Sequence, residues 1–214
     1  MRVYSALYEQ QHDPFGITKE TPVCVTSPDA IPEDAKGYLL LHGGEDISPS
    51  IYGEKNNTYC HASTTPSRRD QLELALIKRA REIDLPIVGI CRGAQLLCCV
   101  DGGKLAQHIV GHHDVPHVII NPNNGQELGK SNTAHHQMMI PRYSKMTRVL
   151  GVVNSPVLSY SENNTLREHD NVPEIVVFNK LKAFGVQFHP EWMKPSDTIV
   201  DWCRRYIIAN LIKE

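Results

Sequence analysis

One short segment near the middle of the chain, Gly89-Ile90-Cys91-Arg92-Gly93, constrains the fold more than any other part of the sequence. An apolar run at residues 85–90 leads into it, and a helix-like segment at residues 93–100 follows it. Glycines on both sides of a central residue predict a sharp turn, because only small neighbours fit so crowded a backbone. A strand that passes directly into a helix in this way is typical of α/β proteins with a parallel sheet.

The first half of the chain fits this pattern. Residues 37–41, Gly-Tyr-Leu-Leu-Leu, form a continuous apolar run that predicts a strand buried on both faces. Residues 2–8 and 22–25 are shorter candidate strands. Ser67 and Asp70 resemble a capping box at the start of a helix with apolar residues at helical spacing.

After Val118 the sequence changes character, because short apolar runs alternate with turns rich in Asn, Pro and Gly. We expect further strands there, some of them antiparallel, at residues 118–120, 148–153, 157–160, 174–178 and 184–188. A helix from about Ser196 closes the chain. The sequence therefore predicts one domain over residues 1–214. Its expected fold is α/β and flavodoxin-like, a mostly parallel central sheet flanked by helices with a few extra antiparallel strands.

Composition excludes several classes of partner. The net charge is −2 and no basic run occurs, so neither a nucleic acid nor an anionic membrane is expected to bind. No apolar stretch approaches the ~20 residues needed to span a bilayer, and the N-terminus lacks the apolar region of a signal peptide. We expect a cytoplasmic protein. Its six cysteines, which show no Cys-x-x-Cys spacing, are expected to be free thiols.

Cys91 is the candidate nucleophile. Open α/β sheets bind ligands at the carboxyl ends of their strands, which is where the turn places this side chain. Cys91 also precedes a helix, whose partly positive N-terminus favours the thiolate form. A buried cysteine that happens to end a strand is the alternative, and the flanking glycines make it the weaker one.

A thiol nucleophile needs a base, and the segment His189-Pro190-Glu191 supplies a candidate. Pro190 favours an extended backbone at His189, and residues two apart in an extended chain point to the same side. Glu191 can therefore orient one imidazole nitrogen while the other reaches Cys91. A surface turn is the alternative interpretation of this motif when it is taken alone.

Acyl transfer also needs two backbone N–H groups that stabilise the negative carbonyl oxygen. The first is expected from Arg92, directly after the nucleophile. The second is expected from the two glycines that end the strand at residues 37–41, where Gly44 is favoured and Gly43 is the alternative. A plain turn would also account for the two glycines.

A metal site is an alternative interpretation of four histidines that lie close together in the sequence, His108, His112, His113 and His117. Asp114 is the only nearby carboxylate at a suitable spacing, and no cysteine accompanies it. We expect solvated loop histidines, or one that reaches the rim of the active site, and no metal or other cofactor.

Together these motifs resemble the class I glutamine amidotransferase superfamily, and most closely its γ-glutamyl-γ-aminobutyrate hydrolase branch. The segments that carry the resemblance run in the family's order, at residues 42–49 with 52–53, 69–73, 86–95, 131–137 and 186–191. The resemblance implies a Cys91-His189-Glu191 triad and a covalent γ-glutamyl thioester. It also implies a substrate pocket formed by Gly43, Gln95, Asn132, Thr133, His135 and His136, where one of the two adjacent histidines touches the substrate and the other packs.

The sequence departs from the family pattern in three places. Thr133 stands where the family tends to have Ser, and Cys98-Cys99 stand where an Asn is expected. The region of residues 125–167 is compact, which is expected to reshape the pocket that receives the leaving amine.

Three functions follow from this resemblance. The first is hydrolysis of a small γ-glutamyl amine by the chain acting alone. The second is a glutaminase subunit that passes ammonia to a synthetase on another chain, since the sequence has no ATP-binding loop of its own. The third, a catalytically silent binding protein, is disfavoured because Cys91, His189 and Glu191 are all present.

Overall fold

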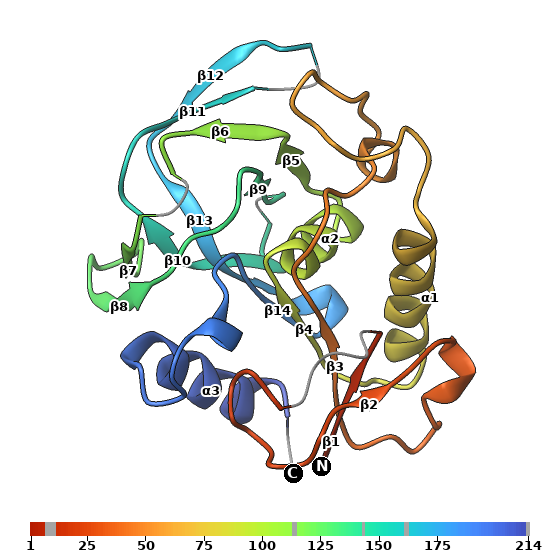
Figure 1. Cartoon of the computed structure of the whole chain (residues 1–214). Helices are drawn as coiled ribbons and strands as arrows, with labels where there is room; N and C mark the ends of the chain where they lie inside the picture. The colour runs from red at the N-terminus through yellow and green to blue at the C-terminus, as the bar shows by residue number, and fades with distance from the viewer. Residues whose placement is uncertain (7–11, 113–114, 143, 161–162, 213–214) are drawn as a thin grey trace.

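The computed structural model describes residues 1–6, 12–112, 115–142, 144–160 and 163–212 (Figure 1). Its centre is a nine-stranded sheet with the order β2-β1-β3-β4-β14-β13-β10-β7-β8. The strands of this sheet are β1 (Arg2–Ser5), β2 (Val23–Cys24), β3 (Gly37–Leu41), β4 (Ile87–Ile90), β7 (His117–Ile120), β8 (Glu127–Ser131), β10 (Thr147–Val153), β13 (Val172–Phe178) and β14 (Ala183–Val186).

The sheet has a parallel and an antiparallel half. Neighbours from β2 to β14 pair in parallel, and those from β14 to β8 pair antiparallel. The predicted α/β class is confirmed, although the antiparallel part is larger than the sequence indicated. The parallel half contains β3 and β4, so their carboxyl ends lie side by side and hold residues 42–44 near Cys91.

Two smaller sheets lie in the upper part of the molecule in Figure 1. Their strands are β5 (Lys104–Ala106) with β9 (Met138–Ile140), and β6 (His108–Val110) with β11 (Val157–Tyr160) and β12 (Leu166–His169). All their pairings are antiparallel.

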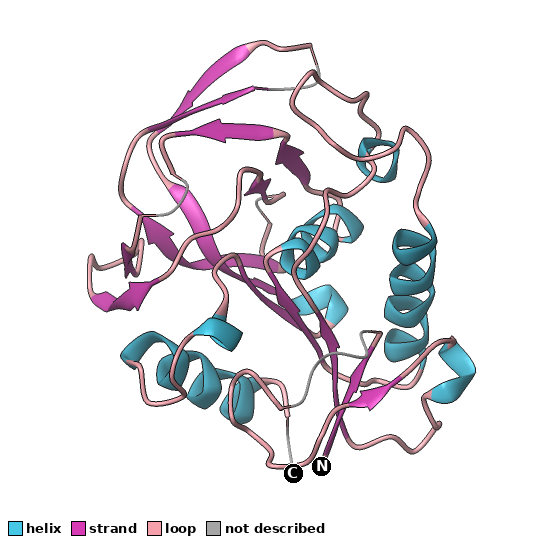
Figure 2. Ribbon diagram, viewed as in Figure 1, coloured by secondary structure: helices cyan, strands magenta, loops and turns pink. Residues whose placement is uncertain are grey.

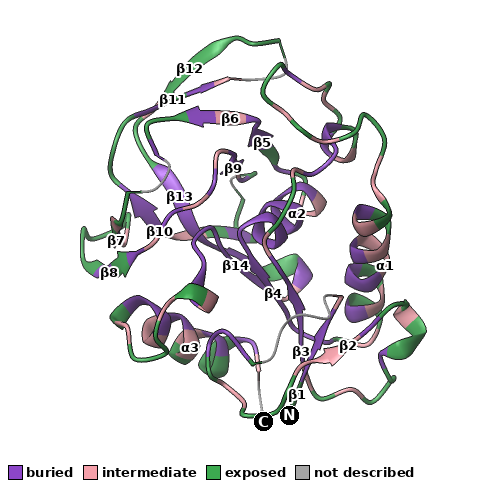
Figure 3. Ribbon diagram, viewed as in Figure 1, coloured by how far each residue is buried: buried purple, intermediate pink, exposed green. Residues whose placement is uncertain are grey.

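Helices cover both faces of the central sheet, as Figure 2 shows. They are α1 (Arg68–Glu82), α2 (Arg92–Val100) and α3 (Thr198–Asn210), with short 3-10 turns at Pro28–Ala30, Pro49–Tyr52, Asn179–Leu181 and Pro190–Trp192. Leu39 and Leu41 of β3 pack into the core beneath α1 and α2, whereas Tyr38 and Leu40 pack into the core beneath α3. This two-residue alternation explains why β3 is apolar throughout, since both of its faces are buried (Figure 3).

The start of α1 forms as its sequence predicts. Ser67 Oγ accepts a hydrogen bond from the Asp70 N–H at 3.0 Å, and Asp70 accepts one from the Ser67 N–H at 2.9 Å. The predicted first strand is shorter than expected, ending at Ser5, and residues 7–11 of the chain lie outside the described ones. In the part of the chain that the structure describes, no helix is long and apolar enough to cross a membrane.

Candidate active site

The turn between β4 and α2 has the predicted sharp geometry. Cys91 has a φ of 48°, which is unusual for a residue other than glycine. A Cβ on Gly89 would lie 2.6 Å from the Gly93 carbonyl carbon, and one on Gly93 would lie 2.3 Å from the Leu41 carbonyl oxygen. Neither position admits a side chain, so the two glycines are what allow this turn to form against the end of β3.

The Cys91 thiol is buried, and its surroundings oppose ionisation. Burial, together with the nearby Glu191 and Glu174 carboxylates, raises the pKa of the Cys91 thiol to about 12, although the Arg92 N–H opposes this shift. The helix N-terminus thus favours the thiolate, as the sequence predicts, but desolvation outweighs its contribution. An attack by this sulfur requires a base that removes its proton during the reaction.

His189 and Glu191 lie close together at the end of β14. His189 Nδ1 lies 2.8 Å from Glu191 Oε1, within hydrogen-bond distance. His189 has a φ of −109° and a ψ of 89°, which is not the extended conformation that the sequence predicts, and Pro190–Trp192 forms a 3-10 turn that folds the carboxylate back toward the ring. On its other side the imidazole stacks on Trp192, with ring centroids 3.9 Å apart and planes 6° apart. The ring is thus fixed by a carboxylate and by an aromatic face.

Gly43 is the point at which these segments meet. A Cβ built on Gly43 would lie 2.6 Å from His189 Cε1 and 3.5 Å from Cys91 Cβ. The structure therefore brings the predicted nucleophile and the predicted base next to the same glycine, within 3.5 Å of one point beside it. Any side chain at residue 43 would displace the imidazole.

Arg69 orients the peptide that follows Gly43. Its Nη2 donates hydrogen bonds to the carbonyl oxygens of His42 at 3.0 Å and of Gly43 at 2.9 Å. The N–H of a trans peptide points opposite to its C=O, so the Gly44 N–H points away from Arg69. This is the orientation in which Gly44, the favoured second donor, can face a substrate oxygen.

The side chain of Arg92 is buried and paired with two carboxylates of α1, those of Asp70 and Glu73. Glu73 also pairs with Arg69, whose Nε lies 2.9 Å from its Oε1. The sequence motifs predicted no role in the site for Arg69, Asp70 or Glu73. Their i, i+1, i+4 spacing on one helix was the available signal.

Two of the predicted pocket residues form hydrogen bonds with other protein groups. Asn132 exchanges two hydrogen bonds with the backbone of His189, at 2.8 and 2.9 Å. Gln95 donates to the Gln137 carbonyl at 3.3 Å. Thr133 is buried, and its hydroxyl has no hydrogen-bond partner among the described residues. Their roles toward a substrate stay predictions, while the two bonds of Asn132 hold the backbone of His189 in place.

The two adjacent histidines point to different surroundings. His136 Nε2 lies 2.9 Å from Asp46 and its Nδ1 lies 3.3 Å from His108. His135 is buried next to Glu174. The expectation that the loop histidines are solvated is wrong for His112, which is buried against the same carboxylate, and His113 lies outside the described residues.

A cavity of about 840 Å³ lies between β8 and the start of α3. Asn132 and Trp192, both of which contact His189, form part of its wall. Trp192 is 65% exposed, so the face of the site next to the base is open to a large ligand group.

The fold is shared with a glutamine amidotransferase of known structure. The crystal structure of a glutamine amidotransferase from Thermotoga maritima matches with a TM-score of 0.53 at 13% identity, covering 98% of this chain and 93% of that one. The chain belongs to the Peptidase C26 family of glutamine amidotransferase-like hydrolases. The sequence model of this family matches residues 33–191.

Two relatives illustrate the range of this family. The glutamine amidotransferase-like protein YvdE of Lactococcus lactis is 30% identical over 183 residues, which cover 74% of this chain and 70% of that protein. The γ-glutamyl-γ-aminobutyrate hydrolase of Escherichia coli is 28% identical over 166 residues, which cover 73% of this chain and 64% of that protein.

Proposed function

We propose that this protein hydrolyses the γ-glutamyl amide bond of a γ-glutamyl amine, with Cys91 as nucleophile, His189 as base and Glu191 as the group that orients the base. The observation that carries this proposal is that Cys91 and His189 both lie next to Gly43, with His189 Nδ1 2.8 Å from Glu191 Oε1. The family and its named hydrolase relative support the same chemistry.

In the first half of the reaction, Cys91 Sγ attacks the γ-carbonyl carbon while its proton passes to His189. The N–H groups of Gly44 and Arg92 donate hydrogen bonds to the resulting oxyanion. His189 then gives the proton to the amine nitrogen, the C–N bond breaks, and a γ-glutamyl thioester remains on Cys91. Because the resting thiol is protonated, proton removal and attack are coupled.

In the second half, His189 removes a proton from water, and the hydroxide oxygen attacks the thioester carbon. The same two N–H groups stabilise the second oxyanion. The C–S bond breaks, the sulfur recovers the proton from His189, and glutamate leaves. Glu191 stabilises the imidazolium that forms in both halves, and Asn132 keeps the backbone of His189 in place.

The amine side of the substrate is proposed to lie over Trp192. This indole is stacked on the imidazole that protonates the leaving nitrogen and is otherwise exposed, so an amine substituent would extend onto its uncovered part. Ammonia, the leaving group of glutamine, has no such substituent. Trp192 therefore favours a substituted amine over glutamine.

Trp192→Ala is expected to lower kcat/KM roughly tenfold more for a substituted γ-glutamyl amine than for glutamine, because both substrates lose the ring that fixes His189 and only the first also loses a contact with its amine, through KM. Steady-state kinetics on both substrates measure this difference. Trp202→Ala is the matched control, because Trp202 stacks on Tyr206 in α3 and not on His189. An equal loss on both substrates would contradict a role in holding the amine.

Arg69→Lys is expected to lower kcat by roughly 10²-fold with little change in KM, because a lysine cannot hold both carbonyls and the Gly44 N–H loses its fixed direction. Arg79→Lys is the matched control. Arg79 lies on the same helix and also donates to a carbonyl, that of Ile31, away from the site. A similar kcat for the two variants would argue against Gly44 as a donor.

The test of the function is glutamate release by the purified chain alone, measured with glutamine and with a set of γ-glutamyl amines that includes γ-glutamyl-γ-aminobutyrate. Efficient turnover of a substituted amine, with glutamine poor, supports the proposal. Turnover of glutamine alone would instead favour a glutaminase subunit that supplies ammonia to a synthetase. No turnover of any substrate would overturn the proposal that the chain acts as a hydrolase by itself.

A further inference from the structure

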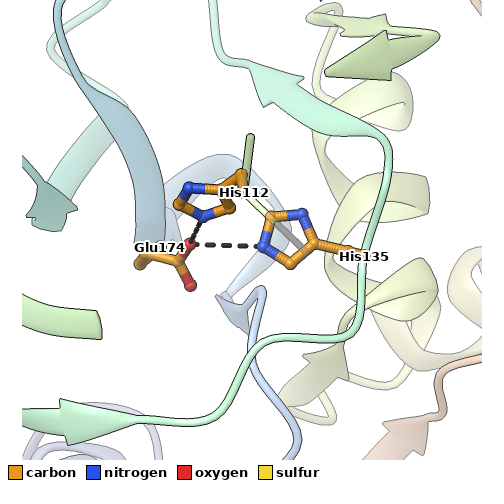
Figure 4. A group of neighbouring side chains, drawn as sticks. All are labelled: His112, His135 and Glu174. Atoms are coloured by element: carbon orange, nitrogen blue, oxygen red, sulfur yellow. Dashed lines mark hydrogen bonds and ion pairs between the residues drawn. The ribbon is translucent and has the colours of Figure 1, made fainter. Parts of the chain in front are cut away.

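A second group of reactive side chains lies behind the candidate active site. In the part of the chain that the structure describes, His112, His135 and Glu174 are the one group of three metal-ligating residues whose ligand atoms all lie within 4.8 Å of one another. Figure 4 shows them converging from three separate segments, with both contacts meeting at one oxygen of Glu174. All three side chains are 1% exposed.

The hydrogen bonding of His135 defines which of its nitrogens carries a proton. Its Nδ1 lies 2.8 Å from the Gln137 carbonyl oxygen, which can only accept. Nδ1 therefore carries the hydrogen, and in the neutral ring Nε2 presents a lone pair. That lone pair faces Glu174 Oε1, an acceptor, at 3.3 Å. Two acceptors in contact require a positive group between them.

A proton on His135 would meet this need only in part. Glu174 Oε2 is also buried, and it has no hydrogen-bond partner among the described residues. The contact between His135 Nε2 and the carboxylate is likewise not aligned as a hydrogen bond. A cation held by both imidazoles and the carboxylate would accept the lone pair of His135 Nε2 and neutralise the buried Glu174 at once.

We propose that His112, His135 and Glu174 bind a divalent transition-metal cation of the Zn²⁺ class. Two imidazole nitrogens and a carboxylate are ligands that suit such an ion. Glu174 Oε1 lies 3.1 Å from His112 Nε2 and 3.3 Å from His135 Nε2. Tetrahedral ligands at about 2.1 Å from an ion are separated by about 3.4 Å, so the side chains need little movement to bind it.

Neighbouring groups hold the two imidazoles in their ligating orientation. The bond from His135 Nδ1 to a backbone carbonyl is the type of contact that fixes a histidine ligand from behind. His112 is stacked on His117, with ring centroids 4.0 Å apart and planes 15° apart. This pre-arrangement lowers the entropy that the ligands lose on binding.

The ion would connect the three segments and support the nucleophile from behind. The backbone of Glu174 accepts a hydrogen bond from the Gln187 N–H at 2.8 Å, and the Gln187 side chain lies 3.7 Å from Cys91 Sγ. The role is structural, since all of the ligating atoms are enclosed by protein. The proposal goes beyond the proposed hydrolysis and does not depend on it.

The test begins with the intact chain, purified without a polyhistidine tag and analysed for metals by mass spectrometry. The protein is then treated with a chelator and titrated with Zn²⁺, and separately with Co²⁺. We expect about one ion per chain, the visible absorption of four-coordinate Co²⁺, and a rise in Tm of roughly 5 °C or more. An absence of bound metal and of any response to either ion would overturn the proposal.

Variants locate the ion. Glu174→Gln and His135→Gln are each expected to weaken Zn²⁺ binding at least 100-fold and to abolish the rise in Tm. His108→Gln is the matched control, since it removes a histidine from the other contacting pair, with His136. Loss of binding in His108→Gln together with retention in Glu174→Gln would assign the ion to the surface and overturn the proposal. The measurements on the unmodified chain decide the question even where a variant fails to fold.

Discussion

Cys91→Ala is expected to lower glutamate release by at least about 10⁴-fold, because no other group could form the thioester. The substitution removes one buried sulfur and retains the turn, so the protein should remain folded. The loss should therefore appear in kcat, with substrate binding preserved. Steady-state kinetics and a thermal melt of the same preparation measure both properties.

Cys98→Ala provides the matched control. Cys98 lies on the same helix, is also buried, and burial raises the pKa of its thiol to about 12 as well. Its removal should cost some stability while activity remains within a few-fold of the parent. If Cys91→Ala keeps its activity, or if the two variants lose it equally, Cys91 is not the nucleophile.

His189→Ala is expected to lower kcat by roughly 10³-fold or more, since nothing else would remove the proton of a thiol with a pKa of about 12. Glu191→Gln should have a smaller effect, a loss of kcat that is about 10- to 100-fold smaller than the loss in His189→Ala. The amide no longer stabilises the imidazolium, but removal of the carboxylate also lowers the pKa of Cys91, which partly offsets the loss. The ratio of the two kcat values tests the assigned roles.

A histidine remote from the site controls for nonspecific effects. His169 lies in β12, where its Nε2 is 2.7 Å from Ser159 Oγ, and His169→Ala should leave kcat near that of the parent. A loss in Glu191→Gln equal to or larger than that in His189→Ala would contradict the orienting role. It would indicate instead that the carboxylate itself moves a proton.

The parts of the fold that the sequence predicts well are those with strong local signals. Strand β3 and helices α1 and α2 follow from a continuous apolar run, a capping box and a pair of glycines, each of which acts within a few residues. The short strands β5, β6, β8, β9 and β12 were not predicted. They have three to five residues each, and their pairing depends on distant segments that no local pattern reveals.

The residues of the candidate site also divide into those that local motifs predict and those that depend on distant segments. Cys91, His189, Glu191 and the two glycines belong to short motifs, so their proximity could be expected from the order of the strands. The bonds of Asn132 to the His189 backbone and the burial of His112 could not be expected, because they depend on how loops of the antiparallel half fold back. The upward direction of the Cys91 pKa could not be expected for the same reason, since burial is a property of the whole fold.

The position of Glu73 has a consequence for how this site can change. Its carboxylate binds Arg69, which orients the peptide before Gly44, and it also binds the side chain of Arg92. The two segments proposed to bind one substrate oxygen are therefore both held in position by Glu73, a single residue of α1. A substitution that shifts one segment also shifts the other. Arg69, Glu73 and Arg92 should therefore vary together or not at all. The spacing of the two donors is a property of one helix and not of two independent loops.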